Sequence, residues 1–272
     1  MQNYTYHSHT YALNKYDGRN TAKEMIEQAE KIGFSEIGIS NHMCYHPNLS
    51  KSSPMNINDI YEAIDTYHQI ISEIREAANG KKIKVYVGFE VDFFPSKRWR
   101  DDFEKISSTI KADYFIGASH IIQSPDESVM VNPYDVLLRG YPCPDNFITD
   151  NYYNYWNVLT EAIKSRYFSF MAHLDLHKIF NLGIEPEWDK QKWQIIDTLS
   201  EYEQPFELNT SGWNKANEQH PHTWMLRELA KRNVPIIISD DAHSTQMLGQ
   251  HFSRAEQLLS DINYKNRWKP LM

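Results

Sequence analysis

The sequence predicts an α/β protein whose core is a parallel sheet of seven strands. Two observations lead to this prediction: short apolar runs rich in β-branched and aromatic residues recur along the chain, and amphipathic stretches of helical period lie between them. This alternation is typical of repeated βα units, in which a helix connects two parallel strands. Seven units fit either a barrel closed one unit short of the usual eight or an open doubly wound sheet, and the alternation leaves both arrangements open.

The predicted strands are short, and several run directly into polar residues. In chain order they are Tyr4–His7, Glu36–Ser40, Ile83–Glu90, Tyr114–Ala118, Phe168–Ala172, Phe206–Asn209 and Pro235–Ser239. Long polar segments follow two of them, Asn41–Asn58 and Gln123–Asn151. Loops of that length in a compact domain are usually functional, so we expect both to border a site.

Two of the predicted helices have a clear apolar face and a glycine at their end. Thr21–Ile32 places Met25 and Ala29 on one face and stops at Gly33, and Asp59–Ala78 has a similar pattern. Further helical patterns cover Arg98–Ile110, Tyr152–Ser165, Lys190–Tyr202, Thr223–Arg232 and Arg254–Leu259.

Composition excludes several classes of protein. The 28 basic and 36 acidic residues give a net charge of −8, which argues against a nucleic-acid or anionic-membrane partner. No apolar run approaches the roughly 20 residues that cross a bilayer, and the first residues do not resemble a signal peptide. With only Cys44 and Cys143 there is no disulfide framework. We expect a cytoplasmic protein without an obligatory protein partner.

The chain has 12 histidines, and many of them lie where predicted strands end. The carboxyl ends of the strands carry His7, His9, His42, Glu90, His120, His173, Asp241 and His243. In a parallel barrel these ends converge on one face, where catalytic residues gather. Each histidine alone is as easily explained as a buried structural group. Six strand ends with ligand-type side chains favour a metal site instead.

The spacing within two of these groups suits a transition metal. His7 and His9 are two residues apart, so both imidazoles point to the same side of an extended chain. Asp241 and His243 repeat this spacing after a buried strand, where an unpaired carboxylate is costly unless a cation compensates it. Such donors favour Zn, Fe or Mn over Ca or Mg.

The remaining six histidines have no such placement. We interpret five as structural or surface groups, and His46, close to His42, stays undecided. The five are His68, His177, His220, His222 and His251.

Short motifs spread along the chain resemble one family. They are HSH near the N-terminus, SNH at Ser40–His42, GFEVD at Gly88–Asp92, ASH at Ala118–His120, AHLDLHK at Ala172–Lys178, ELNTSG at Glu207–Gly212 and SDDAH at Ser239–His243. Together and in this order they resemble the polymerase and histidinol phosphatase (PHP) superfamily, most of all its stand-alone histidinol-phosphate phosphatases. The resemblance covers nearly the whole chain, so we expect residues 1–272 to form a single domain.

The resemblance implies a distorted (β/α)7 barrel that holds two or three divalent ions of Zn, Mn or Fe. It assigns three ligand sets: His7, His9, Glu90 and Asp241; Glu90, His120 and His173; and His42, His243 and Asp17. Two motifs depart from the family pattern. Ser40–Asn41–His42 replaces the common TDH, and the arginine that many relatives carry near ELNTSG is absent here. Lys178 and Lys215 are therefore the basic candidates for substrate binding.

The expected chemistry is hydrolysis of a phosphate monoester. Paired divalent ions neutralise phosphoryl oxygens, lower the pKa of a bound water and stabilise the leaving oxygen. We expect a metal-bound hydroxide near Glu90 to attack phosphorus, with Asp241 and Asp17 completing the catalytic set. Asp17 would act as the acid if it is not a ligand. Asp92, Asp175 and Asp240 are candidates to hydrogen-bond the ligand histidines.

The resulting hypothesis is a phosphatase that converts L-histidinol phosphate to L-histidinol and phosphate in histidine biosynthesis. It would bind a small phosphorylated substrate and neither nucleic acid nor membrane. The alternative is a PHP-type phosphodiesterase or exonuclease acting on nucleotides, against which the acidic composition argues. A metal-dependent amidohydrolase also uses an HxH motif, but that class usually bridges its metals with a lysine rather than a residue placed like Glu90.

Overall fold

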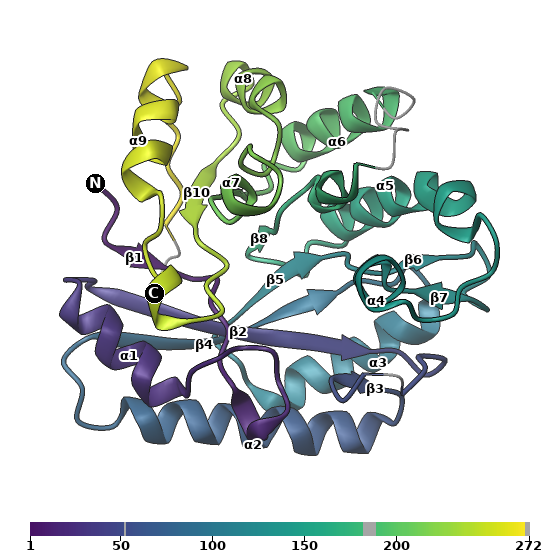
Figure 1. Ribbon diagram of the computed structural model, residues 1–272, viewed down its shortest axis with the longest axis horizontal. Helices are drawn as coiled ribbons and strands as arrows, with labels where there is room; N and C mark the ends of the chain where they lie inside the picture. Colours follow the sequence, from purple (N-terminus) through teal and green to yellow (C-terminus); the bar gives the residue numbers. More distant parts are fainter. Residues whose placement is uncertain (52, 182–188, 270–272) are drawn as a thin grey trace.

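Seven parallel strands form the centre of the molecule (Figure 1). The computed structural model describes residues 1–51, 53–181 and 189–269. In spatial order the strands are β1 (Tyr4–Thr5), β2 (Glu36–Tyr45), β4 (Lys84–Asp92), β5 (Tyr114–Ala118), β8 (Phe170–Met171), β9 (Phe206–Asn209) and β10 (Ile236–Ser239). Each predicted strand corresponds to one of them, in the predicted order.

The sheet curls so that its first and last strands meet. Just beyond β1 and β10, Ser8 and Ala242 form a parallel bridge, and the backbone N–H of His9 donates to the carbonyl of Ala242 at 2.8 Å. The sheet is therefore a nearly closed barrel, which decides between the two arrangements that the sequence left open.

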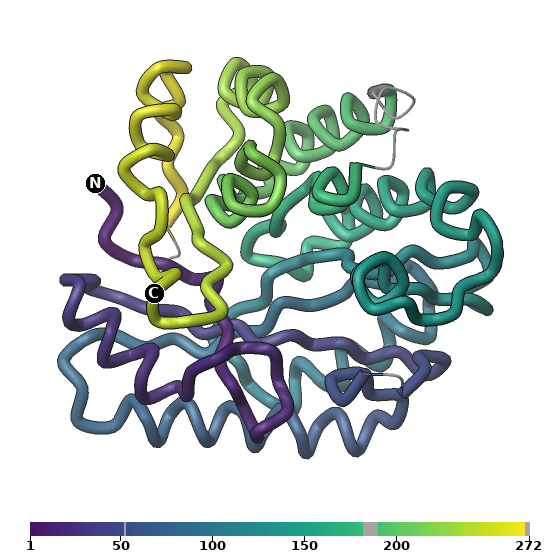
Figure 2. Tube along the Cα trace, viewed as in Figure 1, coloured from purple at the N-terminus to yellow at the C-terminus, as the bar shows by residue number. Residues whose placement is uncertain are grey.

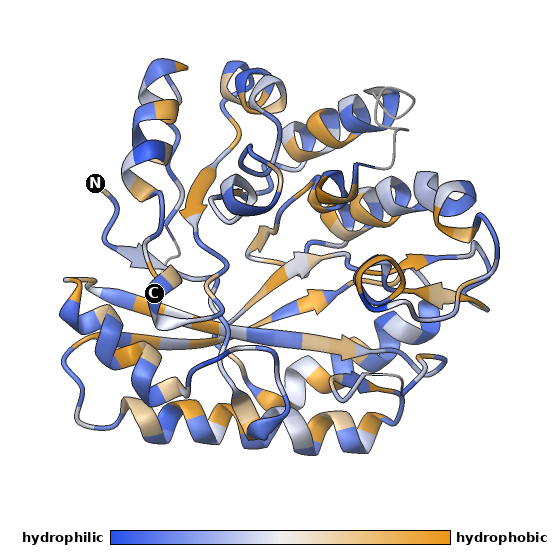
Figure 3. Ribbon diagram, in the orientation of Figure 1, coloured by the Kyte–Doolittle hydropathy of each residue, from blue (hydrophilic) through white to orange (hydrophobic). Residues whose placement is uncertain are grey.

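Helices cover the outside of the barrel, and Figure 3 shows apolar and polar residues alternating along them. The buried apolar residues of these helices belong to the core of the molecule. The helices are α1 (Ala22–Lys31), α2 (Ile60–Ala78), α3 (Lys97–Ile110), α5 (Phe147–Ser165), α6 (Asp189–Glu201), α8 (Thr223–Lys231) and α9 (Phe252–Asp261). Capping hydrogen bonds explain where three of these helices begin. Thr21 and Glu24 form a capping box at α1, and the side chains of Asp59 and Ser96 accept backbone N–H groups at α2 and α3.

The first and last parts of the chain lie side by side, as the trace in Figure 2 shows. The backbone N–H of Gln2 donates to Glu256 of α9 at 2.8 Å. Arg267 pairs with Ile236 of β10 as an isolated parallel bridge. These contacts hold the N-terminal strand against the last unit of the barrel. No helix among the described residues is long and apolar enough to cross a membrane.

The segments expected to be long loops contain more structure than the sequence indicates. β2 continues five residues past the predicted end at Ser40, because residues 41–45 are buried and pair with β4 and with β3 (Asn56–Ile57). The second segment contains the antiparallel pair β6 (Ile122–Gln123) and β7 (Met130–Val131), followed by α4 (Pro133–Arg139). Short turns η1 (Ala12–Asn14), η2 (Leu176–Phe180), α7 (Gly212–Lys215) and η4 (Thr245–Met247) complete the connections.

Aromatic and aliphatic side chains fill the barrel beneath its carboxyl-end face. Tyr6, Tyr114, Ile116, Phe170 and Ile237 pack together there, and the hydroxyl of Tyr114 donates to the carbonyl of Tyr6 at 2.6 Å. A Cβ on Gly88 would lie 2.3 Å from the Tyr114 ring, so only glycine fits there. This filled interior gives the polar groups above it a rigid floor.

Candidate metal centre

Nine histidine and carboxylate side chains meet above the carboxyl ends of the strands. They come from the segment after β1, from β2 and β4, and from the turns after β5, β8 and β10. The nine are His7, His9, Asp17, His42, Glu90, His120, His173, Asp241 and His243, the same set that the sequence placed at strand ends together with Asp17.

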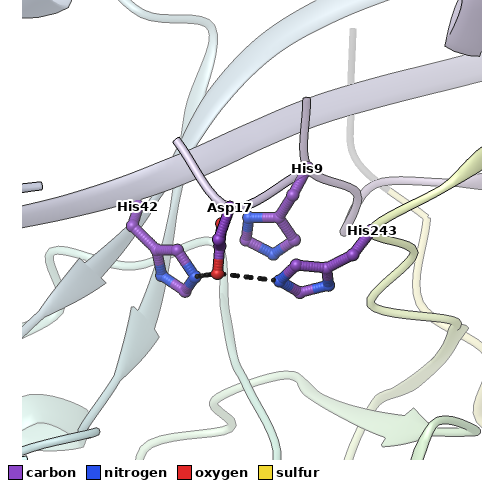
Figure 4. A group of neighbouring side chains, drawn as sticks. All are labelled: His9, Asp17, His42 and His243. Carbon is purple, nitrogen blue, oxygen red and sulfur yellow. Dashed lines mark hydrogen bonds and ion pairs between the residues drawn. The ribbon is translucent and has the colours of Figure 1, made fainter. Parts of the chain in front are cut away.

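One group surrounds Asp17 at the open side of the face (Figure 4). Oδ2 of Asp17 lies 3.3 Å from Nε2 of His42 and 3.2 Å from Nε2 of His243. The His9 ring stacks against both imidazoles, with ring centroids 4.5 Å from His42 and 4.2 Å from His243. One ligand atom from each of these four residues lies within 4.8 Å of the others, which suits a single cation.

Glu90 lies at the centre of the cluster, with its two oxygens facing different histidines. Oε1 is 2.8 Å from Nε2 of His173 and 3.4 Å from Nε2 of His120. Oε2 is 3.0 Å from Nδ1 of His42 and 3.4 Å from Nε2 of His7. A carboxylate placed between two sets of imidazoles has the geometry of a bridge between two cations.

Asp241 lies on the remaining side of the cluster, next to His7 and His9. Its Oδ1 lies 3.2 Å from Nε2 of His9 and 3.6 Å from Nε2 of His7. The backbone of Asp241 is in the left-handed region (φ 48°), an uncommon conformation for a residue other than glycine that asparagine and aspartate tolerate best. The turn aims its carboxylate back over the strand ends.

The groupings seen in the structure overlap the three ligand sets that the resemblance implied, with three differences. His9 joins the Asp17 group, and His42 comes close to Glu90 and His120. His173 groups with His7 and Asp241 as well as approaching Glu90. Which residue coordinates which ion therefore stays a prediction.

Burial makes a cation the natural partner of these atoms. His7 and His9 are fully buried, and Glu90 is 1% exposed. Both oxygens of Glu90, Nε2 of His7 and both ring nitrogens of His9 make no hydrogen bond of normal geometry within the described residues. Buried polar atoms without hydrogen bonds are costly, and converging nitrogen and carboxylate donors suit Zn, Mn or Fe. The residues present fit such ions.

The charges in the centre depend strongly on one another. Burial alone would raise the pKa of Glu90, but the surrounding histidines hold that pKa well below its usual range. Burial alone would lower the pKa of His7, but the neighbouring carboxylates raise it well above the usual value. At His9, burial and the nearby imidazoles lower the pKa to about 3. Without cations, the carboxylates are thus balanced by protons on some of the histidines.

Glu207 is a supporting residue that the sequence analysis did not single out. From β9 its carboxylate accepts from Nδ1 of His7 at 2.8 Å, from the backbone N–H of His173 at 2.9 Å and from Nδ2 of Asn209 at 2.7 Å. A hydrogen bond to Nδ1 orients the His7 ring with Nε2 towards the cluster. The sequence feature that could have identified Glu207 was its position as a glutamate inside the buried apolar strand Phe206–Asn209.

The three aspartates expected to support the ligand histidines differ in their contacts. Asp92 accepts from Nδ1 of His120 at 3.0 Å, as expected. Asp175 accepts from Nδ1 of His220 instead, at 2.7 Å, and Asp240 accepts from Thr5 and from the backbone N–H of Gly249. Within the described residues, neither of the last two hydrogen-bonds a histidine of the cluster, since their oxygens are taken up by other donors.

The two lysines proposed for substrate binding lie in different places. Nζ of Lys215 lies 3.7 Å from Oδ2 of Asp241 and lines the cavity above the cluster. Lys178 lies apart from the cavity: it is buried, and its ammonium donates to Asp175 and to the carbonyl of Gln219. A buried ammonium already paired in this way has no free face for a phosphate.

Two of the remaining histidines have definite structural partners. Nε2 of His46 contacts Glu127 at 2.9 Å, and Nδ1 of His46 accepts from the backbone N–H of Asn48. This contact ties the segment after β2 to the β6–β7 turn. His220, expected to be a structural or surface group, is fully buried against Asp175, with its ring 6.2 Å from that of His173.

His220 leads to a prediction about pH and stability. Burial lowers its pKa to about 4, although Asp175 opposes the shift, whereas an unfolded histidine titrates near 6.5. Between these values only the unfolded chain binds the proton, so the folded state loses stability as pH falls through this window. Compared with wild type, His220→Asn should lose about 2 kcal/mol less of its unfolding free energy between pH 7 and pH 5.

The measurement is urea unfolding of the metal-free proteins at the two pH values, because bound metal would add a pH dependence of its own. Asp240, whose pKa burial raises to about 7, shifts stability in the opposite direction and is common to both proteins. The difference between wild type and variant therefore isolates His220. Equal pH dependence in the two proteins would contradict the prediction.

A cavity of about 160 Å³ opens above the cluster. Besides the cluster residues, its lining includes Cys44, Ser53, Met55, Asn56, Asp92, Ile121, Asn132, Tyr134, Asp135, Arg139, Leu176 and Lys215. Many of these come from the two long segments after β2 and β5, so both segments border the cavity above the cluster. The cavity can hold a small molecule with one end against the cluster.

Comparisons with known proteins agree with this geometry. The model of the PHP domain family matches residues 5–211. A probable histidinol-phosphatase of Deinococcus radiodurans is 25% identical over 260 residues, covering 94% of this chain and 92% of that protein. The histidinol-phosphatase of Bacillus subtilis is 22% identical over 263 residues, covering 92% and 96%.

Two solved structures share the fold. A putative histidinol phosphatase from Listeria monocytogenes superposes with a TM-score of 0.70 at 16% identity, covering 92% of this chain and 99% of that one. The histidinol phosphate phosphatase of Lactococcus lactis, solved with zinc, L-histidinol and phosphate, gives a TM-score of 0.64 at 16% identity, covering 96% and 94%.

Proposed function

Because this chain belongs to the PHP domain family, we propose that it is a metal-dependent phosphatase that hydrolyses L-histidinol phosphate to L-histidinol and phosphate. The observation that carries the proposal is the convergence of nine ligand-type side chains, with unpartnered buried atoms, at the floor of a cavity of small-molecule size. The substrate follows from the named relatives and from the ligands bound by the Lactococcus lactis protein.

The cluster offers places for two or three divalent ions, Zn, Mn or Fe. Asp17, His42 and His243 would hold one at the open side, and the groups on the two sides of Glu90 would hold the others. Asp241 completes the inner part. When bound, such ions neutralise phosphoryl oxygens, provide a nucleophile at neutral pH and stabilise the leaving oxygen.

The residues of the chain keep this arrangement fixed. Glu207 orients His7, and Asp92 orients His120, so both imidazoles present Nε2 to the centre. Asp17 contacts two histidines, and although burial opposes it, they hold its pKa well below the usual range. Asp17 is thus a carboxylate at neutral pH, which suits a ligand better than the general acid considered for it.

Lys215 is the cation of the chain best placed to contact the phosphoryl group. Its ammonium lies in the cavity beside Asp241 and is only one-third exposed. A point charge there would attract a phosphate dianion to the cluster, in the role that the sequence analysis considered for this lysine.

Replacing Lys215 should therefore weaken the enzyme without abolishing it. For Lys215→Ala we expect kcat/KM to fall about 10- to 100-fold, since one charge-assisted hydrogen bond is lost, and Lys215→Arg should retain most of the activity. Steady-state kinetics check this, with the exposed Lys231→Ala as the control. An activity of Lys215→Ala within twofold of wild type would exclude the contact.

The proposed function is tested by phosphate release from three substrates with Zn, Mn and Fe each supplied. L-Histidinol phosphate should be turned over with the highest kcat/KM, ahead of a nucleoside monophosphate, and a dinucleotide diester should not be cleaved. Preference for the diester would favour the nucleotide phosphodiesterase alternative. Absence of phosphate release with all three metals would refute the proposal.

A further inference from the structure

The cavity has a second polar wall, away from the cluster, that the proposed chemistry does not use. Helix α4 contributes Tyr134, Asp135 and Arg139 to the lining, and Asn132 precedes them. Tyr134 lines the same cavity as His173 and Asp241 of the cluster. The residues of α4 therefore face the part of a substrate that projects from the cluster.

Asp135 differs from the other carboxylates that line the cavity. Asp17 and Asp241 belong to the cluster, and Asp92 accepts from His120 and from the thiol of Cys44. Asp135 accepts only from Arg139, with Oδ1 to Nη1 at 2.8 Å, and its Oδ2 has no hydrogen-bond donor among the described residues.

The burial of Asp135 makes this arrangement unusual for a helix-surface ion pair. The side chain of Asp135 is 12% exposed, whereas that of Arg139 is 60% exposed. Arg139 thus contacts one oxygen of a largely buried carboxylate in the wall of the cavity. A largely buried carboxylate with a single cationic contact can accept a further donor from a ligand in the cavity.

The wall is held in place by contacts remote from the cluster. Glu127, in the turn before β7, accepts from the His46 ring at 2.9 Å and from the backbone N–H of Ser96 at 3.0 Å. Asn132 caps α4 by accepting from the backbone N–H of Tyr134 at 3.0 Å. The backbone N–H of Asp135 donates to the carbonyl of Asn132 at 3.0 Å, and Arg139 contacts its carboxylate. Asp135 is therefore a preorganised group, as a specificity contact needs to be.

We propose that Asp135 binds the ammonium group of the substrate and selects phosphate esters of amino alcohols over neutral esters. This inference rests on the proposed function, since L-histidinol phosphate carries a primary ammonium group on the carbon chain between its phosphate and its imidazole. The two ends of the cavity then complement the two charges of the substrate, with the cluster and Lys215 at the phosphate and Asp135 at the ammonium.

The test compares L-histidinol phosphate with 3-(imidazol-4-yl)propyl phosphate, the same ester without the amino group. Wild type should prefer the amino ester about 10- to 100-fold in kcat/KM, the range expected for one charge-assisted hydrogen bond in a buried site. Asp135→Asn should lose this preference, mainly through KM for the amino ester, while kcat/KM for the deamino ester stays within about twofold. Asp145→Asn makes the same charge change at an exposed position of the following loop and should keep the preference.

The outcomes separate this inference from the proposed function. If wild type hydrolyses L-histidinol phosphate well and Asp135→Asn slows both esters equally, or slows neither, Asp135 has no role in selection although the function stands. If wild type hydrolyses the deamino ester and p-nitrophenyl phosphate but not L-histidinol phosphate, both the substrate and the ammonium contact are refuted.

A measurement on wild type covers the case in which Asp135→Asn does not fold. L-Histidinol should inhibit at least about tenfold more tightly than 3-(imidazol-4-yl)propanol, because only the former carries the ammonium group. Equal inhibition by the two alcohols would overturn the inference without any variant.

Discussion

Glu90→Ala should lose at least one equivalent of bound metal and at least about 1,000-fold in kcat/KM. Glu90 is the one carboxylate of the described cluster whose two oxygens face different sets of histidines, so its removal takes a ligand from both sides at once. Metal ions contribute several kcal/mol to transition states of this kind, and each 1.36 kcal/mol is a factor of ten in rate.

Metal analysis of the purified variant and steady-state kinetics measure the two effects. Glu90→Gln keeps the size of the side chain and should behave like the alanine variant if charge and coordination matter more than packing. Glu62→Ala, at an exposed position of α2, is the matched control and should keep both metal and activity. Loss of less than one equivalent from Glu90→Ala would show that Glu90 does not bridge.

The barrel was predictable because each strand is a separate apolar run with a polar end. The same pattern places the ligand-type residues, since a side chain that ends a parallel strand necessarily lies on the carboxyl face. The end of β2 was misplaced because Asn41 and His42 read as loop residues, whereas both are buried and paired with β4. Polar residues inside a strand are the usual signature of a site, and they hide the strand from a hydrophobicity pattern.

The supporting residues could not be predicted in the same way, because their partners are distant in sequence. Glu207 is 200 residues from His7, and His220 is 45 residues from Asp175. No local period signals such contacts. The residues of α4 are a further example: Asp135 lies in a segment without strong periodicity, and only the fold brings it over the strand ends.

Removing the metals with a chelator should reduce activity below about 1% of the starting value and lower the melting temperature by roughly 5–10 °C. The stability effect is expected because the buried atoms of Glu90, His7 and His9 would lose their cation partners, and a ligand present at 100 times its dissociation constant stabilises the folded state by about 2.7 kcal/mol. Activity and melting temperature should both return when Zn or Mn is added. Calorimetry and kinetics on the same sample measure them, and full activity after complete removal would refute the metal requirement.

How strongly the centre holds its metals should also depend on pH, and the protonation of its histidines sets the direction of this dependence. Burial opposes protonation of His7 and His42, but neighbouring carboxylates raise the pKa of both well above the usual value, so the metal-free centre holds protons near neutral pH. A cation must displace these protons, and metal affinity should therefore rise with pH. The free metal concentration that half-fills the centre should be higher at pH 6 than at pH 8, and titration of metal into the stripped protein should release protons to the buffer. In Glu90→Ala one of the carboxylates that hold the protons is gone, so fewer protons should be released. Equal proton release from variant and wild type would mean that Glu90 does not control the charge of the centre.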